Sequence, residues 1–315
     1  MYIIPLLIAL AEILVYPGLI FSVVFGGIIV WMYRKVRARL QGRRGPPWYQ
    51  TYADVFKLLI KETIIPWRAW KVGFVAAPMI SLAALFSAIL LLPFFGKESA
   101  LGFLGDAIVL LYLLTVPTFA IIFGGMSSGS PYGIVGSGRE ASLLVWYELP
   151  LWLSAATVFA LANSISVSGI VEEQALHGPF AIRLPLAFIA FLIAAQAKLA
   201  KRPFDIPHAE TEIVAGPYTE YSGSLRALFE LSEVFKWLAV SALAATLFLG
   251  WPITGNIVAD ALIFIGKVVL FALIFAFIDV INPRLRIEQA GWPLWKIAAA
   301  LALIDAIRVC AGLVF

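Results

Sequence analysis

Long apolar runs separated by short polar stretches dominate the chain. Eight of these runs come near the ~20 residues that an α-helix needs to cross a bilayer. The breaks between them contain Gly, Pro and Ser, which favour turns and helix ends. The pattern predicts an all-α integral membrane protein in which residues 1–315 form one membrane domain. The predicted spanning helices are Ile4–Met32, Phe74–Phe95, Leu101–Phe123, Ser142–Ala162, Ile182–Leu199, Leu225–Leu249, Ile257–Ile281 and Leu294–Val314.

A ninth helix is predicted between the first two spans, over about residues 47–62. Trp48, Tyr52, Phe56 and Leu59 recur there at helical spacing, and charged residues occupy the other faces. Such an amphipathic helix lies in the plane of the membrane interface. It serves either as a membrane anchor or as a docking platform for a cytoplasmic partner, and the sequence leaves both open.

The composition agrees with a lipid environment and limits the cofactors that this chain could bind. Apolar residues make up 62% of the chain and charged residues 13%, roughly half the charge that a soluble domain carries. A single cysteine, Cys310, excludes a disulfide framework and an iron–sulfur cluster held by this chain alone. His177 and His208 are too few and too far apart for a zinc or haem site. We therefore expect no metal or redox cofactor in this chain.

The basic residues predict the orientation of the chain. Ten of its 23 Lys and Arg residues lie between the first two spans, whereas the opposite side has Lys97 and Arg183. Basic loops stay in the cytoplasm. The segment of residues 200–224 falls on the same side as the basic loops, and eight spans then leave both termini outside.

Charged residues inside spans are the first candidates for function. Each costs roughly 2.5–3.5 kcal/mol on the insertion scale, so each needs a partner or a wet cavity. Spacing predicts i,i+3 pairs between Glu233 and Lys236 and between Asp305 and Arg308. Buried acids either relay protons or only cancel neighbouring charges. These residues are Glu12, Glu140, Glu148, Lys198, Glu230, Glu233, Lys236, Lys267, Asp279, Asp305 and Arg308.

The densest polar segment is the cytoplasmic loop of residues 200–224. It carries Asp205, Glu210, Glu212 and Glu220 together with His208, and prolines interrupt any continuous helix at its start. Irregular backbone beside spanning helices is tolerated where it lines a buried or wet cavity. In such a cavity His208 is expected to titrate nearest to physiological pH.

Three motifs in this order resemble one known family. They are RARLQGRRGPPWYQTYADVFKLLIKE, GSGREASLLVWYELP and PFDIPHAETEIVAGPYTEYSG. They are similar to the H subunit of NADH–quinone oxidoreductase (respiratory complex I). The short form GRRGPPWYQTYADVFKLL looks most like the membrane-anchor subunit of energy-converting membrane-bound nickel–iron hydrogenases, and like related sulfur-reducing complexes.

The resemblance implies a coupling role without a catalytic site in this chain. The subunit would join cytoplasmic large and small iron–sulfur subunits of hydrogenase type to antiporter-like membrane subunits, with no role for nucleic acid. Iron–sulfur clusters and a nickel–iron centre would belong to those partners. The family's proton or ion path would use the spanning-helix glutamates Glu148 and Glu233, the loop carboxylates Asp205, Glu210 and Glu212, and the arginine Arg139.

Departures from the family pattern separate this chain from the quinone-reducing branch. His208 and Lys198 stand where that branch has glutamate, Tyr33 replaces another glutamate, and Asp279 replaces an arginine. The expected function is therefore ion-coupled energy conversion in a hydrogenase-type complex. A quinone-site subunit, the equivalent subunit of a sulfur-reducing complex, and a stand-alone secondary transporter remain alternatives. Neither the electron acceptor nor the ion, H⁺ or Na⁺, follows from the sequence.

Overall fold

The computed structural model describes residues 13–94, 99–208, 210–250, 252 and 254–314, without the side chains of Glu210, Thr211 and Ile257. Within these ranges the chain is helical and contains no β-strand. Six helical segments are long and apolar enough to cross a membrane, and Pro185–Lys198 is a shorter apolar helix. This confirms the predicted all-α, multi-pass membrane fold. The six segments are Leu19–Leu40, Lys71–Leu90, Asp106–Ser127, Pro131–Ala162, Gly223–Phe248 and Val258–Ile281.

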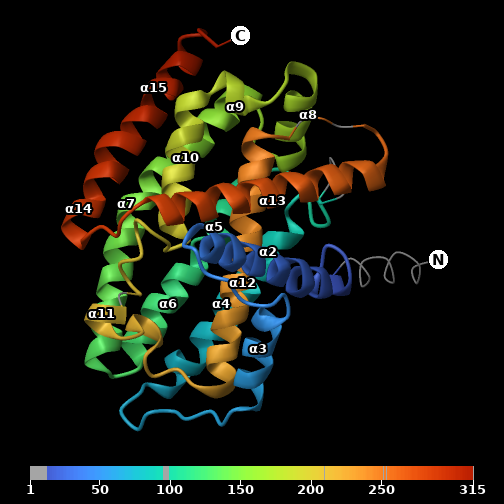
Figure 1. Cartoon of the computed structure of the whole chain (residues 1–315). Coiled ribbons are helices and arrows are strands. Elements are labelled where there is room, and N and C mark those ends of the chain that lie inside the picture. The colour runs from blue at the N-terminus through green and yellow to red at the C-terminus, as the bar shows by residue number, and fades with distance from the viewer. Residues whose placement is uncertain (1–12, 95–98, 209, 251, 253, 315) are drawn as a thin grey trace.

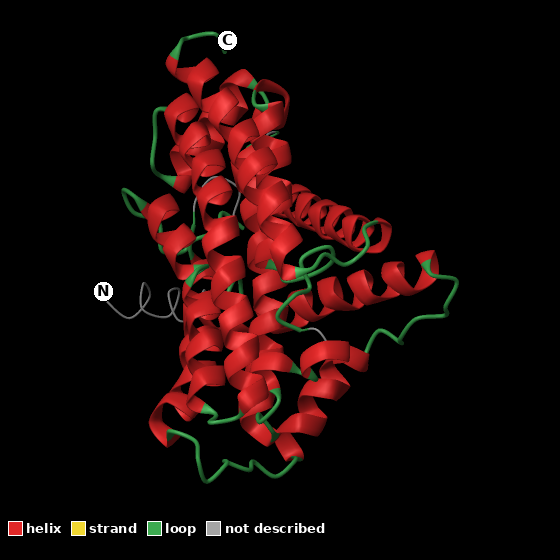
Figure 2. Cartoon of the chain, turned by 90° about the vertical axis from the view of Figure 1, so that its left-hand side faces the viewer, coloured by secondary structure: helices red, strands yellow, loops and turns green. Residues whose placement is uncertain are grey.

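The chain order of the elements shows where irregular segments interrupt the helices (Figures 1 and 2). Two short elements, α11 and a 3₁₀ turn, lie in the connection between α10 and α12. The elements are α2 (Leu19–Leu40), α3 (Gln50–Ile60), α4 (Lys71–Leu90), α5 (Asp106–Leu113), α6 (Val116–Ser127), α7 (Pro131–Ala162), α8 (Val167–His177), α9 (Phe180–Arg183), α10 (Pro185–Lys198), α11 (Glu210–Ile213), the 3₁₀ turn Gly216–Tyr218, α12 (Gly223–Phe248), α13 (Ile257–Ile281), α14 (Ile287–Trp292), the π-helical segment Pro293–Ala298 and α15 (Ala299–Cys310).

Helix α12 is the central element of the fold. Of its most apolar stretch, 89% is buried inside the protein, more than in any other candidate span among the described helices. It contacts α2, α3, α4 and α13 along its length. In Figure 1, α2 and α13 run across the direction of α7, α10 and α12. Because α12 is surrounded by protein, its charged residues must find protein partners instead of lipid headgroups.

Several predicted helix boundaries are corrected by the structure. The first helix ends at Leu40 and not at Met32, so Arg37 and Arg39 lie on its last turns. Residues 4–12 of that prediction, including Glu12, lie outside the described residues. The span predicted to start at Ser142 begins at Pro131, which places Arg139 and Glu140 inside α7.

Three further differences concern breaks in the apolar runs. The predicted span Leu101–Phe123 is two helices, α5 and α6, separated at Leu114 and Thr115. Helix α8 was not predicted, because its polar residues give it a low hydropathy. The last predicted span is helical from Ile287 to Cys310, with a π-helical turn in its middle.

A helix is present where the sequence predicted the amphipathic one, as α3, and it spans Gln50–Ile60 within the predicted residues 47–62. The Trp48 and Phe56 side chains are exposed, as expected for a helix that lies on a membrane surface. Tyr52 instead packs against Gly27 of α2, and its hydroxyl donates to the carbonyl oxygen of Val24 at 2.5 Å. This contact fixes the amphipathic helix to the first span.

The predicted Asp305–Arg308 pair is also confirmed, and it has a structural partner that the sequence did not indicate. Asp305 is fully buried and accepts hydrogen bonds from the backbone N–H groups of Leu186 and Ala187, at 2.9 and 2.8 Å. A carboxylate is favourable there, because the first N–H groups of a helix have no partner within the helix. Asp305 therefore docks α15 onto the start of α10.

Candidate functional site

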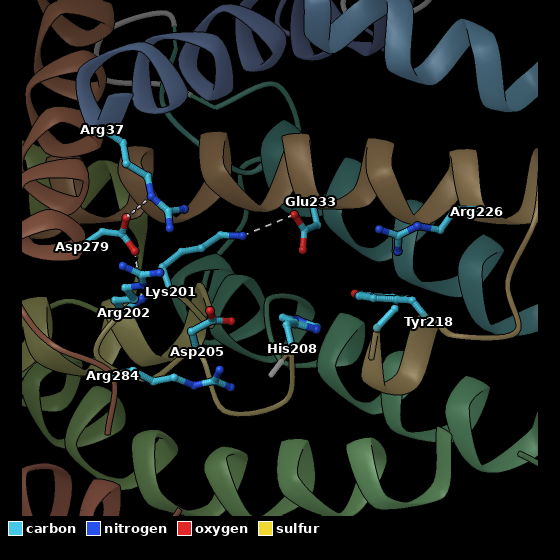
Figure 3. A pocket seen from close by; sticks show the side chains of 11 residues that line it. Arg37, Lys201, Arg202, Asp205, His208, Tyr218, Arg226, Glu233, Asp279 and Arg284 are labelled. Carbon is cyan, nitrogen blue, oxygen red and sulfur yellow. Dashed lines mark hydrogen bonds and ion pairs between the residues drawn. The ribbon is translucent and has the colours of Figure 1, made fainter. Parts of the chain in front are cut away.

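A pocket of about 360 Å³ lies where the α10–α12 connection meets α2, α12 and the end of α13 (Figure 3). Charged side chains from several segments of the chain point toward it. Apart from Ala215, every residue of its wall carries a charged or titratable side chain. The lining residues are Arg37, Lys201, Arg202, Asp205, His208, Ala215, Tyr218, Arg226, Glu233, Asp279 and Arg284.

Asp279 joins three segments at one edge of this pocket. Its carboxylate accepts hydrogen bonds from the Tyr33 hydroxyl at 3.1 Å and from the backbone N–H of Arg202 at 3.0 Å. It also forms an ion pair with Arg37 at 3.2 Å. Tyr33 and Asp279, which both depart from the quinone-branch pattern, are thus bonded to each other.

Glu233 pairs with a residue of the loop and not with its own helix. Lys201 Nζ lies 3.6 Å from Glu233 Oε2 (Figure 3), and no ion pair joins Glu233 to Lys236 among the described residues. The predicted i,i+3 pair is therefore wrong. Glu230 binds Arg226, one helical turn away on α12. Glu233 thus connects the α12 helix with the segment between α10 and α12.

Asp205 and His208 both line the pocket, with Asp205 on the side of Arg284 and His208 on the side of Tyr218 (Figure 3). Burial raises the pKa of Asp205 to about 6, against the opposing effect of Lys201, Arg284 and Arg202. Burial also lowers the pKa of His208 to about 3. The expectation that His208 titrates near physiological pH is thus wrong, because the neutral ring is stacked on Tyr218 with centroids 5.2 Å apart.

Two of the remaining predicted loop carboxylates, Glu212 and Glu220, lie away from the pocket wall. Glu212 is exposed and accepts a hydrogen bond from Arg139, which holds its pKa below the ordinary value. Glu220 is half-buried and does not line the pocket. The side chain of Glu210 lies outside the described residues. The structure therefore divides the predicted acidic cluster into a buried part and a surface ion pair.

The loop keeps its shape through a tight backbone approach at Gly216. The residue has a φ of +56°, in the left-handed region that favours glycine. A Cβ atom there would overlap the carbonyl oxygen of Pro207, the residue before His208. Gly216 thus allows the turn that seats His208 under Tyr218.

Replacing Gly216 with alanine is expected to displace the loop without unfolding the helices. The clash is with backbone, so relief requires movement of the Pro207–His208 segment or of the 3₁₀ turn. We expect proteolytic cleavage within residues 200–224 to become at least about tenfold faster, equivalent to a local cost of about 1.4 kcal/mol. The matched control is Gly178→Ala, where φ is +88° but no atom lies near the added Cβ. Equal cleavage rates in the two variants would contradict this account.

Further charged residues are buried among the helices beyond the pocket. Glu140 of α7 is 1% exposed, and one of its carboxylate oxygens has no hydrogen-bond partner within the described part of the chain. The charged groups that act on it are Lys236, Glu233 and Lys198. Both Lys236 and Lys198 are buried. Glu140 is therefore influenced both by Glu233 of α12, which lines the pocket, and by Lys198 of α10.

Glu148 forms the far end of this series. Its carboxylate pairs with Lys198 Nζ at 2.7 Å and accepts hydrogen bonds from Thr115 at 3.1 Å and Trp152 at 2.9 Å. Together with Tyr112 it lines an apolar groove of about 380 Å³ between the α5–α6 break and α7. The break at Thr115 thus supplies a hydroxyl to Glu148. Through this groove, Glu148 is the member of the buried charged residues that reaches the surface of the helix bundle.

The structure brings most of the charged residues singled out from the sequence into one region, linked by ion pairs and by the charges that act on Glu140. Glu148, Lys198, Glu140, Lys236, Glu233, Asp205, His208 and Asp279 belong to it, and Glu230 adjoins it. Sequence reasoning missed the pocket residues Arg37, Lys201, Arg202, Arg226 and Arg284 as candidates. It used some of them only for topology, although their position at helix ends beside the acidic loop was a usable signal.

Comparisons with known proteins agree with this geometry. The NADH dehydrogenase family model matches residues 12–310. The chain is 38% identical to the H subunit of NADH-quinone oxidoreductase from Thermomicrobium roseum over 302 residues, covering 88% of each protein. It is 39% identical to the same protein of a Geobacillus species over 285 residues, covering 86% of this chain and 84% of that one.

Among solved structures, a chain of the membrane-bound sulfane sulfur reductase, an archaeal respiratory membrane complex, is similar throughout. The TM-score is 0.87 at 31% identity, with 96% of this chain and 99% of that chain covered. Both the family model and these relatives extend over nearly all helices that build the pocket and the buried charges. The chain belongs to the NADH dehydrogenase family and is the H-type membrane subunit of a respiratory complex related to complex I.

Proposed function

We propose that this subunit couples a cytoplasmic redox reaction to ion translocation in a hydrogenase-type respiratory complex. The observation that carries the proposal is the series of charged residues from Asp205 and Glu233, past Lys236 and Glu140, to Glu148. Electron transfer in a neighbouring iron–sulfur subunit would change the charge near the pocket. The acids would respond by changing their proton occupancy, and partner subunits of antiporter type would receive the change at Glu148. The redox centres, iron–sulfur clusters and a nickel–iron site, would belong to the cytoplasmic partners.

The pocket lining favours this role over quinone reduction. A quinone needs apolar surface for its ring and tail, because such sites are mostly apolar with a few polar groups. Eight of the eleven lining residues here carry ionisable acids or bases other than histidine and tyrosine. Lys198, where the quinone branch has glutamate, forms an ion pair with Glu148. These features support a hydrated, charged chamber.

A second candidate is the equivalent subunit of a sulfur-reducing complex. The similarity to the sulfane sulfur reductase chain at 96% coverage favours it specifically. Both candidates give this chain the same coupling role and differ only in the acceptor used by the partner subunit.

The test uses the complete complex purified from its native membrane and reconstituted into vesicles. Reduced ferredoxin is supplied as electron donor, and hydrogen, sulfide from a sulfane donor, and quinol are measured separately. Hydrogen production with simultaneous ion uptake supports the hydrogenase assignment, and sulfide production supports the second candidate. Quinol formation that is blocked by a quinone-site inhibitor would contradict both. Full ion uptake by the Glu148→Gln variant would reject the carboxylate path.

The raised pKa of Asp205 predicts a pH effect. With a pKa of about 6, its carboxyl group is mostly protonated below pH 6 and ionised above it. Since the folded pKa exceeds the ordinary value of 3.8, ionisation destabilises the pocket as the pH rises between about 4 and 6. We therefore expect Asp205→Asn to remove a step near pH 6 from the rate of ion uptake. Glu212→Gln is the control, and an unchanged step in Asp205→Asn would contradict the assignment.

A further inference from the structure

We propose that the pocket between the loop and α2, α12 and α13 binds a small anion. This inference deepens the proposed function and rests on it for the role of the pocket. Binding itself can be measured without turnover. The ligand class is a compact anion with one or two negative charges and hydrogen-bond acceptor atoms.

The balance of charge in the pocket is the first argument. Five basic side chains line it, against the three acids Asp205, Glu233 and Asp279. Two of these acids are already engaged, since Asp279 is held by Arg37 and Glu233 by Lys201. Arg226 is offset by Glu230 outside the lining. Within the described residues, Arg202 and Arg284 make no ion pair with any carboxylate, which leaves excess positive charge.

Unused hydrogen-bond donors are the second argument. Nε of Arg202 and Nη1 of Arg226 are both shielded from solvent and have no hydrogen-bond partner in the described part of the protein. Both residues line this pocket. A buried donor without an acceptor costs roughly 1–3 kcal/mol, and more when it is charged. An anion in the pocket would supply acceptors to guanidinium groups on both the loop and α12.

Asp205 makes no direct bond to these cations among the described residues. Lys201, Arg284, Arg202 and Arg37 all act on its carboxylate, yet none of them donates a hydrogen bond to it among the described residues. Figure 3 shows these side chains arranged around the open space beside Asp205 and His208. The volume of about 360 Å³ accommodates an anion together with water molecules. These cations thus line the pocket near Asp205 without a direct bond to its carboxylate.

Anion binding and protonation of Asp205 are expected to favour each other. The ionised carboxylate repels an anion, whereas the neutral acid donates a hydrogen bond, so binding should tighten as the pH falls through 6. The other charged or titratable groups that face this space come from the loop, α2, α12, α13 and the segment after α13. They are Lys201, Arg202, His208, Tyr218, Arg37, Arg226, Glu233, Asp279 and Arg284.

The experiment measures thiocyanate binding to the purified complete complex in chloride-free buffer. The C≡N stretching band of thiocyanate shifts when the ion leaves water for a guanidinium site, so infrared titration reports binding directly. We expect one shifted, saturable band whose affinity weakens about ten- to a hundredfold in Arg202→Gln, since one unit charge is lost from the site. Asp205→Asn should bind at least as tightly as the wild type and lose the dependence on pH near 6.

The matched control is Arg286→Gln, the same charge change two residues beyond Arg284 and outside the pocket lining. Equal weakening in Arg286→Gln and Arg202→Gln would indicate general surface attraction and would overturn the proposal. Absence of a saturable band would do the same. So would a density map of the intact complex in which a partner's side chain fills the pocket. Ion uptake is measured separately on the same variants, so loss of coupling with normal thiocyanate binding rejects only the proposed function.

Discussion

Replacing Glu148 with glutamine is expected to reduce ion uptake per electron by about two orders of magnitude, the contribution typical of a positioned proton-transfer group. Glutamine preserves the size of the side chain, and its one carbonyl oxygen can still accept from either Thr115 or Trp152, which donate to different oxygens of the carboxylate. It cannot exchange a proton in the same way. Electron transfer in the cytoplasmic subunits should continue when the ion gradient is dissipated. The measurement is the ratio of ions taken up to electrons transferred in reconstituted vesicles.

The single variant has a second effect that must be separated from the first. Lys198 is 1% exposed, and without Glu148 its ammonium group is buried without its ion-pair partner. Breaking such a pair costs roughly 3–5 kcal/mol. The double variant Glu148→Gln with Lys198→Met removes both charges, so it should recover stability while uptake stays low. A double variant that regains wild-type uptake would show that Glu148 serves only as a counter-ion.

The control for Glu148 is Glu173→Gln. Glu173 also has a polar partner, His177 Nδ1 at 2.8 Å, but on α8, apart from the buried series. We expect this variant to keep its uptake ratio within about twofold, since surface pairs contribute little. Reduced uptake in both variants would indicate a general effect of removing acids.

Replacing Asp305 with alanine is expected to cause the largest loss of stability, about 3–5 kcal/mol. The carboxylate is fully buried, accepts from the Leu186 and Ala187 backbone N–H groups and pairs with Arg308. Alanine leaves both N–H groups without an acceptor and opens a gap between α10 and α15. The measurement is the thermal unfolding of the complex in detergent, followed through dissociation of this subunit.

A matched substitution separates this effect from loss of charge. Asp54→Ala removes an exposed ion pair with Arg34, whose side chains are 39% and 36% accessible, and should cost less than about 1 kcal/mol. Asp305→Asn keeps an acceptor oxygen and should fall between the two alanine variants. An Asp305→Ala complex as stable as Asp54→Ala would contradict the assigned capping role.

Much of the fold could be predicted because membrane spans depend on local composition. Each of the eight predicted apolar runs contains a helix in the described structure, and the interfacial helix is present as α3. Boundaries were predicted less well, since the loss of apolar character does not end a helix. Backbone hydrogen bonds carry α2 through Arg37 and Arg39, and α7 begins eleven residues before the predicted start at Ser142.

The sequence could predict many residues of the candidate site, but not which of them form ion pairs with one another. Spacing rules describe neighbours on one helix, so they predicted Glu233 with Lys236. The folded loop instead brings Lys201 to Glu233 from a segment 32 positions away in the chain. The prediction for His208 failed because it also used only local information. The ordinary pKa of histidine suggested a titrating group, but burial against Tyr218 keeps the ring neutral.

By itself, the sequence determined that this chain is an all-α membrane subunit, that its helices carry acids, and to which family it belongs. These properties follow from residue type and local order, which an extended chain already contains. Only the tertiary structure decided which charges meet, namely Asp279 with Tyr33 and Arg37, and Lys198 with Glu148. The physical reason is that burial and charge pairing depend on distances between segments that are far apart in the sequence.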